Sequence, residues 1–220
     1  MWQTTAERPA VVYDAEESSA MDVWLVEERG FTIPQLMAQA GARVAEAIRD
    51  LAREHDLTRV VFLVGPGNNG GDAVVASELL GAAEFEQETW RPLQDSATPL
   101  LDAGTLVVDG LFGVGLARPV GGEARRAVEH VNTSPARVLA VDIPSGLSAT
   151  SGEVVGCTAG APDGGVAIRA HETITLVGPK AGFFIARGPE HVGRWRSGDI
   201  GFPIEEAERW VVGRRAAAAD

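Results

Sequence analysis

Short, continuous apolar runs alternate with helical segments along this chain, and that alternation constrains the fold more than any other feature. The clearest run covers residues 59–64, and others occur at 106–108, 138–141 and 174–177. A strand that is apolar at every position suits the interior of a parallel sheet, where both faces are covered by helices. We therefore predict a doubly wound α/β fold, with a mostly parallel sheet and helices on both faces.

Helical periodicity and capping signals place the helices between these runs. Asp14 with Glu17, and Thr32 with Gln35, have the spacing of capping boxes, which predicts helices over about 14–28 and 32–55. Further helices are expected at about 72–83 and 123–131. We divide the chain into an N-terminal arm (1–13), one α/β domain (14–204) and a C-terminal helix or tail (205–220).

Composition and charge exclude several classes of protein. With 31 acidic and 19 basic residues the net charge is −12, which disfavours a nucleic-acid partner. A lone cysteine, Cys157, allows neither an internal disulfide nor a cysteine-based zinc site. The N-terminus lacks the pattern of a signal peptide, and no apolar stretch reaches the roughly 18 residues of a membrane span. We expect no membrane association and a cytoplasmic location.

A glycine-rich turn follows the first apolar run. Gly65, Gly67 and Gly70 match G-x-G-x-x-G, a pattern in which backbone N–H groups at a helix start can bind a pyrophosphate. A tight turn without a ligand would explain the glycines equally well. The polar side chains of Asn68, Asn69 and Asp72 in the same turn favour a ligand or ion.

Polar residues also follow the later runs. Asp109 and Asp142 each end an apolar run beside glycine or proline, and Ser145 lies just beyond. A single such aspartate is usually a turn or cap residue, but three at successive strand ends, Asp72, Asp109 and Asp142, indicate a shared site. Lys180, the only lysine of the chain, follows the last run; it is either a surface residue or a compact charge that the site needs.

In order, the segments GPGNNGGD, DGLFGVGLARP, VDIPSG, TITLVGPKAG and GDIGFP resemble the YjeF N-terminal domain family over about residues 13–203. The resemblance implies a Rossmann-like fold and NAD(P)H-hydrate epimerase activity, an isomerisation that interconverts the R and S forms of hydrated NADH and NADPH (NADHX and NADPHX). It also implies a homodimer, and a functional link to an ADP- or ATP-dependent dehydratase that repairs one epimer.

The resemblance also assigns site residues. It implies a potassium ion held by Asn69, Asp109 and Ser145, whose oxygens suit a hard cation. We hypothesise that Asp142 is the catalytic general acid/base and that Lys180 assists electrostatically. The substrate-binding residues implied are Asn68, Asn69, Gly70, Gly71, Asp72, Gly113, Val114, Gly115, Leu116, Ala117, Arg118, Pro119 and Asp142.

Two intervals depart from the family pattern. Only 37 residues (109 − 72) separate Asp72 from Asp109, so the domain is expected to be one strand–helix unit shorter than the family. The sequence therefore does not determine how the sheet edge next to the first motif is built, or whether full activity is kept. Conversely, residues 157–165 read as an extended, flexible surface loop.

Two other functions remain open. The G-x-G-x-x-G pattern could belong to an NAD-dependent dehydrogenase with Glu84, Glu86 or Glu88 on the ribose, but this leaves Asp109, Asp142 and Ser145 unexplained. A catalytically weak or inactive binding or scaffold module is the other alternative, favoured by the short interval before Asp109. The sequence contains four histidines, all outside these motifs, and we expect none to be a ligand.

Overall fold

The computed structural model of the 220-residue chain describes all residues except 7, 82–83, 158–163 and 220. Most of the loop expected at 157–165 therefore lies outside the described residues. The elements in chain order are α1 (Ala15–Glu27), α2 (Ile33–His55), β1 (Arg59–Val64), α3 (Asn68–Leu80), β2 (Glu86–Trp90), β3 (Thr105–Gly110), α4 (Gly122–Thr133), β4 (Arg137–Val141), β5 (Glu172–Leu176), η2 (Ala181–Phe183), α5 (Gly188–Val192), β6 (Arg194–Gly198) and α6 (Ile204–Ala219).

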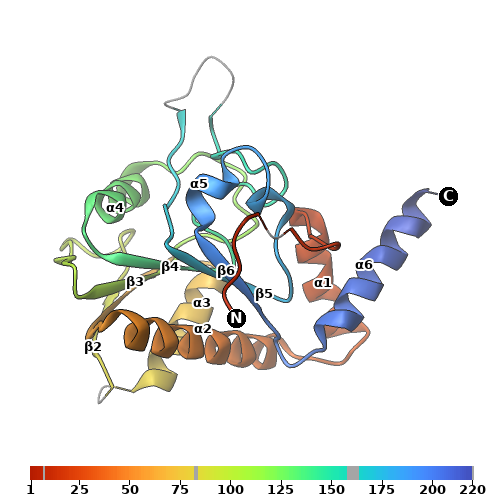
Figure 1. The fold of residues 1–220 in the computed structure, drawn as a ribbon, viewed down its shortest axis with the longest axis horizontal. Coiled ribbons are helices and arrows are strands. Elements are labelled where there is room, and N and C mark those ends of the chain that lie inside the picture. Colours follow the sequence, from red (N-terminus) through yellow and green to blue (C-terminus); the bar gives the residue numbers. More distant parts are fainter. Residues whose placement is uncertain (7, 82–83, 158–163, 220) are drawn as a thin grey trace.

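The strands form one sheet in the order β2-β1-β3-β4-β5-β6, with every neighbouring pair parallel (Figure 1). The register pairs Val60 with Leu106 and Leu63 with Asp109, so the carboxyl ends of β1 and β3 lie side by side. The chain reverses its direction of travel across the sheet between β1 and β3. In open parallel sheets ligands bind beside such a reversal.

Helices cover both faces of the sheet, as the sequence predicts. On one face α2 and α3 pack against Val60, Phe62 and Leu106, all fully buried. On the other face α4 packs against Val61 and Val107. Alternate residues of β1 thus point into opposite cores, which explains why residues 60–64 are all apolar.

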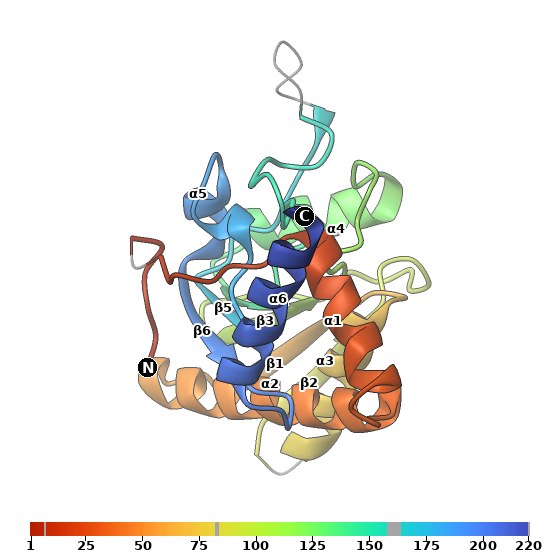
Figure 2. The same cartoon turned by 90° about the vertical axis from the view of Figure 1, so that its right-hand side faces the viewer.

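The first and last helices form a third apolar cluster beside the sheet. Met21 and Leu25 of α1 pack with Ala207 and Val211 of α6, and Trp24 lies 5.3 Å from Trp210 between ring centroids. Figure 2 shows α1 and α6 side by side. Ion pairs from Arg214 to Glu16 and from Arg215 to Glu17 add to this contact.

The capped helices begin where the sequence predicts. Asp14 and Glu17 form a complete capping box at α1, and Thr32 and Gln35 form another at α2. By contrast α3 begins at Asn68, four residues before the predicted start, so the asparagines and glycines of the motif form its first turn.

The short interval before Asp109 contains a strand that the sequence did not reveal. Residues Glu86–Trp90 pair in parallel with β1, so this sheet edge is occupied. Strand β2 therefore lies in this interval, and residues 91–104, between it and β3, contain no helix. Strand β6 and the short helix α5 were also not predicted.

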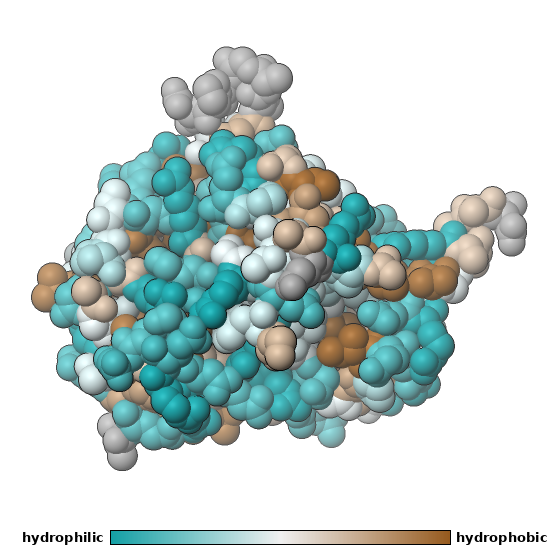
Figure 3. All heavy atoms as spheres, in the orientation of Figure 1, coloured by the Kyte–Doolittle hydropathy of each residue, from teal (hydrophilic) through white to brown (hydrophobic). Residues whose placement is uncertain are grey.

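The surface is mostly hydrophilic on the face shown in Figure 3, with scattered apolar residues. This agrees with a sequence in which 23% of residues are charged. Within the described residues, no helix is both long enough and apolar enough to span a lipid bilayer.

Candidate functional site

A cavity of about 770 Å³ lies at the carboxyl edge of the sheet. Its floor comes from the segments that follow β1, β3, β4 and β5, and its walls from α1 and α2. A volume of this size is typical of sites for small molecules and cofactors, which span about 300–1,000 Å³. The cavity therefore lies where the topology predicts a ligand.

The glycine-rich turn is built for close backbone packing at the start of α3. A Cβ atom on Gly65 would lie 1.7 Å from the carbonyl oxygen of Leu111, and one on Gly70 would lie 2.1 Å from that of Gly65. Gly67 is the N-cap of α3, and no side chain caps the helix. Free N–H groups at this helix start therefore face the cavity end of the sheet and can bind an anion.

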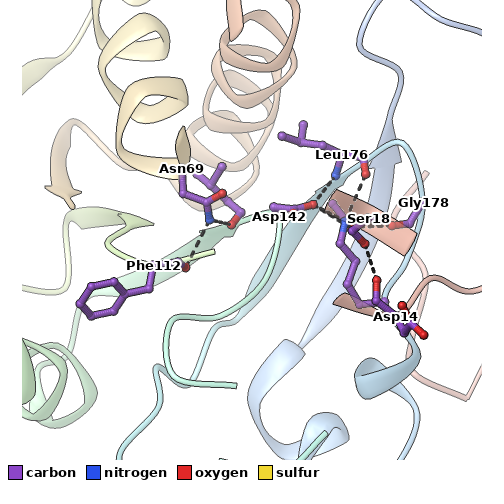
Figure 4. Close-up of polar contacts among 10 residues, drawn as sticks. Asp14, Ser18, Asn69, Phe112, Asp142, Leu176 and Gly178 are labelled. Carbon is purple, nitrogen blue, oxygen red and sulfur yellow. Dashed lines mark hydrogen bonds and ion pairs between the residues drawn. The ribbon is translucent and has the colours of Figure 1, made fainter. Parts of the chain in front are cut away.

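Asn69, Asp109 and Ser145 are brought together around the backbone of Phe112. The Asn69 amide donates to the carbonyl oxygens of Val141 (2.7 Å) and Phe112 (3.3 Å), as Figure 4 shows in part. Ser145 Oγ donates to Asp109 Oδ1 (2.6 Å) and accepts from Phe112 N–H (2.8 Å). Because Asn69 Nδ2 donates to two carbonyl oxygens, the other amide atom, Oδ1, remains available to accept a hydrogen bond or to coordinate a cation.

Asp109 is a fully buried carboxyl group without a cationic partner among the described residues. Backbone N–H groups of Leu111 (3.2 Å) and Ser145 (2.8 Å) donate to it, along with Ser145 Oγ. Burial nevertheless raises the pKa of Asp109 to about 6. A negative charge at this depth, surrounded by amide, hydroxyl and carbonyl oxygens, fits a hard monovalent cation.

Asp142 and Lys180 form a buried ion pair on the cavity floor. Asp142 Oδ1 accepts from Lys180 Nζ, from Leu176 N–H (2.9 Å) and from Thr175 Oγ1 (3.3 Å). Lys180 is only 2% exposed and also donates to Thr175, Leu176 and Gly178. These contacts fix the Asp142 carboxylate at the end of β4 (Figure 4).

The backbone of Asp142 is itself unusual. It has φ +64°, a left-handed conformation that residues other than glycine rarely adopt. Its N–H donates to Ile174 O at 2.8 Å, which ties the turn after β4 to β5. Backbone strain of this kind is found most often at ligand and catalytic sites.

Three further carboxyl groups line the cavity, those of Asp22, Glu27 and Asp72, and two of them have raised pKa values. Asp72, in the first turns of α3, is buried, and burial together with Asp142 and Asp22 raises its pKa to about 8. Asp22, from α1, keeps solvent-accessible surface, but the enclosing cavity walls and Asp142 raise its pKa to about 6. At neutral pH the cavity thus contains at least one carboxyl group that holds a proton.

The structure brings most of the predicted site residues to one place. The cavity lining includes the predicted residues Asn68, Asn69, Asp72, Gly113, Val114, Gly115, Leu116, Asp142 and Lys180. Ser145 contacts Phe112, a residue of the cavity lining, and Asp109 in turn contacts Ser145. Gly70, Gly71, Ala117, Arg118 and Pro119 are not among the described residues that line it.

Sequence reasoning missed the wall formed by α1. Ser18, Asp22 and Val26 repeat every four residues, which places them on one face of the helix, and all three line the cavity. The four-residue spacing of the polar residues Ser18 and Asp22, beside the core positions Met21 and Leu25, was the available signal.

The parallel sheet, the glycine turn at a helix start and the strand-end carboxyl groups define an α/β protein that binds a ligand at the carboxyl edge of its sheet. Residues 34–98 and 84–182 match the family described as YjeF-related protein N-terminus, which is more than half of the chain. The chain therefore belongs to this family.

Several relatives support the same assignment. The chain is 40% identical to an NAD(P)H-hydrate epimerase of Bordetella bronchiseptica over 66% of its own length and 70% of that protein. It is 32% identical to one of Lentilactobacillus buchneri, over 84% of this chain and 92% of that one. A bifunctional NAD(P)H-hydrate repair enzyme of Thermosynechococcus vestitus is 30% identical, over 92% of this chain and 38% of that protein.

Solved structures with a similar fold include that of a yeast protein. The crystal structure of yeast ynu0 superposes with a TM-score of 0.62, covering 83% of this chain and 84% of that chain at 22% sequence identity. The arrangement of strands and helices thus resembles that of the yeast protein.

Proposed function

We infer that this chain is an isomerase, an NAD(P)H-hydrate epimerase that interconverts the R and S forms of hydrated NADH and NADPH. The observation that supports it most is the Asp142–Lys180 pair on the floor of a cavity next to an uncapped helix start. The match to the epimerase of Lentilactobacillus buchneri, whose name states this activity, covers 92% of that protein. The activity repairs a damaged cofactor.

The geometry suits a substrate with an anionic and an uncharged end. We propose that Asn68, Asn69, Gly70, Gly71 and Asp72, together with residues 113–119, bind the substrate, with its phosphates near the N-terminus of α3. Such local help is needed because the chain carries a net charge of −12. The hydrated nicotinamide would then lie above Asp142.

We further propose that Asp142 moves a proton during the reaction. Inversion at C6, which carries a hydroxyl and is bonded to nitrogen, requires protons to leave and return on oxygen or nitrogen. A carboxylate fixed by Lys180, Leu176 and Thr175 can accept such a proton without reorganising.

The buried Asp109 carboxyl supports a proposal that Asn69, Asp109 and Ser145 hold a potassium ion. A bound cation would supply positive charge next to the phosphate subsite and would fix the loops after β1, β3 and β4 relative to one another. The carboxyl group, the amide oxygen of Asn69 and the Ser145 hydroxyl would hold it.

We extend the proposal to the setting of the enzyme. The family suggests a cytoplasmic homodimer whose product passes to a dehydratase, and a bifunctional relative bears the name of a repair enzyme. We also propose that residues 14–204 form the epimerase domain, preceded by an arm and followed by the helix α6.

The test is direct. Separated NADHX epimers are mixed with the protein and a dehydratase that consumes one epimer, and conversion of the other is followed. Asp142→Asn should lower the rate by about 100- to 10,000-fold, as is typical when a general acid or base is removed. Near-normal turnover by Asp142→Asn would refute its role; hydride transfer to NAD with no epimerisation would instead indicate a dehydrogenase.

A further inference from the structure

Asp72 differs from Asp109 and Asp142 in having no hydrogen-bond partner among the described residues. Its side chain is 6% exposed and lines the cavity. No other residue in the described part of the chain donates to its carboxyl group, whereas Asp142 receives three hydrogen bonds. Burying a carboxylate without donors is costly, so an unpartnered carboxyl group favours its neutral form.

The charges around Asp72 act in the same direction. Asp142 after β4 and Asp22 of α1 both face it, and each makes ionisation harder. Lys180 is already paired with Asp142, and α2 lines the cavity with the uncharged residues Leu36, Met37 and Ala40. Glu27 of α1 adds a further acidic group to the cavity wall.

Two carboxyl groups in one cavity are thus held in opposite states. Asp142 is a carboxylate in an ion pair, and Asp72 retains its proton because burial raises its pKa to about 8. Enzymes commonly assign acid and base roles to carboxyl groups whose surroundings separate them in this way.

We propose that Asp72 is the proton donor and Asp142 the proton acceptor in epimerisation, with Asp22 as a positioning residue that keeps Asp72 protonated. This inference rests on the proposed function. It assigns complementary roles to two groups of the cavity, and it gives a role to a residue of α1 that carries no sequence motif.

The chemistry balances without any further reactant. Asp142 takes the proton of the C6 hydroxyl, the C6–O bond becomes a carbonyl, and the C6–N1 electron pair moves to N1. Asp72 protonates N1, which gives a ring-opened aldehyde. After rotation about the C5–C6 bond, N1 attacks the other face of the aldehyde, returns its proton to Asp72, and the new hydroxyl recovers its proton from Asp142. Nothing is oxidised or reduced.

The main experiment measures kcat and KM for separated NADHX epimers between pH 6 and pH 9.5. Wild-type kcat should fall as the pH rises above about 8, because Asp72 then loses the proton that it must donate. Asp72→Asn should lower kcat by about 100- to 10,000-fold, with a smaller change in KM, and should remove this fall. Glu78→Gln, an exposed position on the same helix, is the matched control.

Asp22→Asn separates the positioning role from a structural one. Removing the negative charge should ease ionisation of Asp72, so the fall in kcat should begin at a lower pH while the protein keeps its melting temperature. An unchanged pH profile in Asp22→Asn would overturn the role of Asp22, and this variant also reports on Asp72 if Asp72→Asn fails to fold.

The outcomes distinguish failure of the proposed epimerase activity from failure of the role assigned to Asp72. If the wild-type protein does not epimerise either form, the proposed function is wrong. If it does, and folded Asp72→Asn keeps kcat within threefold over the whole pH range, the function stands and Asp72 is not the proton donor.

Discussion

Four aspartates at one edge of the sheet show how surroundings decide what a carboxyl group can do. Asp109 is fully buried among hydrogen-bond donors, and Asp142 is paired with Lys180. Asp72 is buried with no hydrogen-bond partner in the described part of the chain, and Asp22 remains accessible on α1. The same functional group is therefore available in this site as a candidate cation ligand, a proton acceptor, a proton donor and a source of negative potential.

The proposed potassium site gives a prediction at the scale of single residues. Potassium chloride should raise the melting temperature above that in lithium chloride at equal ionic strength, because a ligand that binds only the folded state stabilises it. At a potassium concentration of 100 times Kd, the free energy of unfolding should rise by about 2.7 kcal/mol. Thermal unfolding followed by circular dichroism measures it without substrate.

The control for this prediction is Asp109→Asn, which keeps the shape of the side chain and removes its charge. The variant should lose most of the difference between the two salts. An equal difference in wild type and variant would place the cation elsewhere.

At the scale of elements, the close approach of β1, β3 and α3 depends on glycine. Gly65→Ala would place a Cβ 1.7 Å from Leu111 O, a backbone atom that cannot move away alone. We expect a loss of roughly 1–3 kcal/mol or more in the free energy of unfolding, and weaker substrate binding, because the start of α3 must shift.

Gly67→Ala is the matched substitution in the same turn. A Cβ at Gly67 meets no atom within 4 Å, and the residue has φ −97°, which alanine adopts readily. The change should cost about 0.5–1 kcal/mol, less than Gly65→Ala, because alanine is a poorer N-cap residue than glycine but meets no clash here. Urea unfolding of the two variants compares them, and equal losses would contradict this packing argument.

The elements that the sequence predicts well are those with one dominant signal. Strand β1 is apolar at five successive positions, and two capping boxes mark where α1 and α2 begin. Strand β2, Glu86–Trp90, was missed because it is polar and lies at the sheet edge, where only Trp90 is buried. It forms a strand because its backbone pairs with β1, a contact that its own sequence does not indicate.

The site could be predicted in its strand-end residues and not in its wall. Asp109, Asp142 and Ser145 follow apolar strands, and parallel strands bring their ends together whatever the connections are. Asp22 could not be placed in this way, because α1 contacts the sheet through tertiary packing with α6 and α2. Sequence motifs predict the residues of the cavity floor, whereas the position of the wall depends on packing between helices that are far apart in the sequence.

At the scale of the whole molecule, the cavity wall depends on the contact between α1 and α6. Val211 is fully buried in this contact, and Val212 beside it is 52% exposed. Val211→Asp should cost roughly 3 kcal/mol or more, because it buries an unpaired charge among Met21, Leu25 and Ala207.

Val212→Asp introduces the same charge on the same helix and should change stability by no more than about 0.5 kcal/mol. Substrate affinity should fall in Val211→Asp only, since α1 carries one wall of the cavity. Measurement of both unfolding and binding tests this, and a normal affinity in a destabilised Val211→Asp protein would show that the wall does not need α6.

The pairing of α1 with α6 also has a consequence for synthesis on the ribosome. The sheet and its strand-end residues are all present once residue 198 has emerged, but the cavity wall must wait for a helix that ends at residue 219. A nascent chain halted before that point would carry the acidic floor with an unsupported α1. Ligand binding by this protein should therefore appear late, and abruptly, once residues 204–219 have emerged.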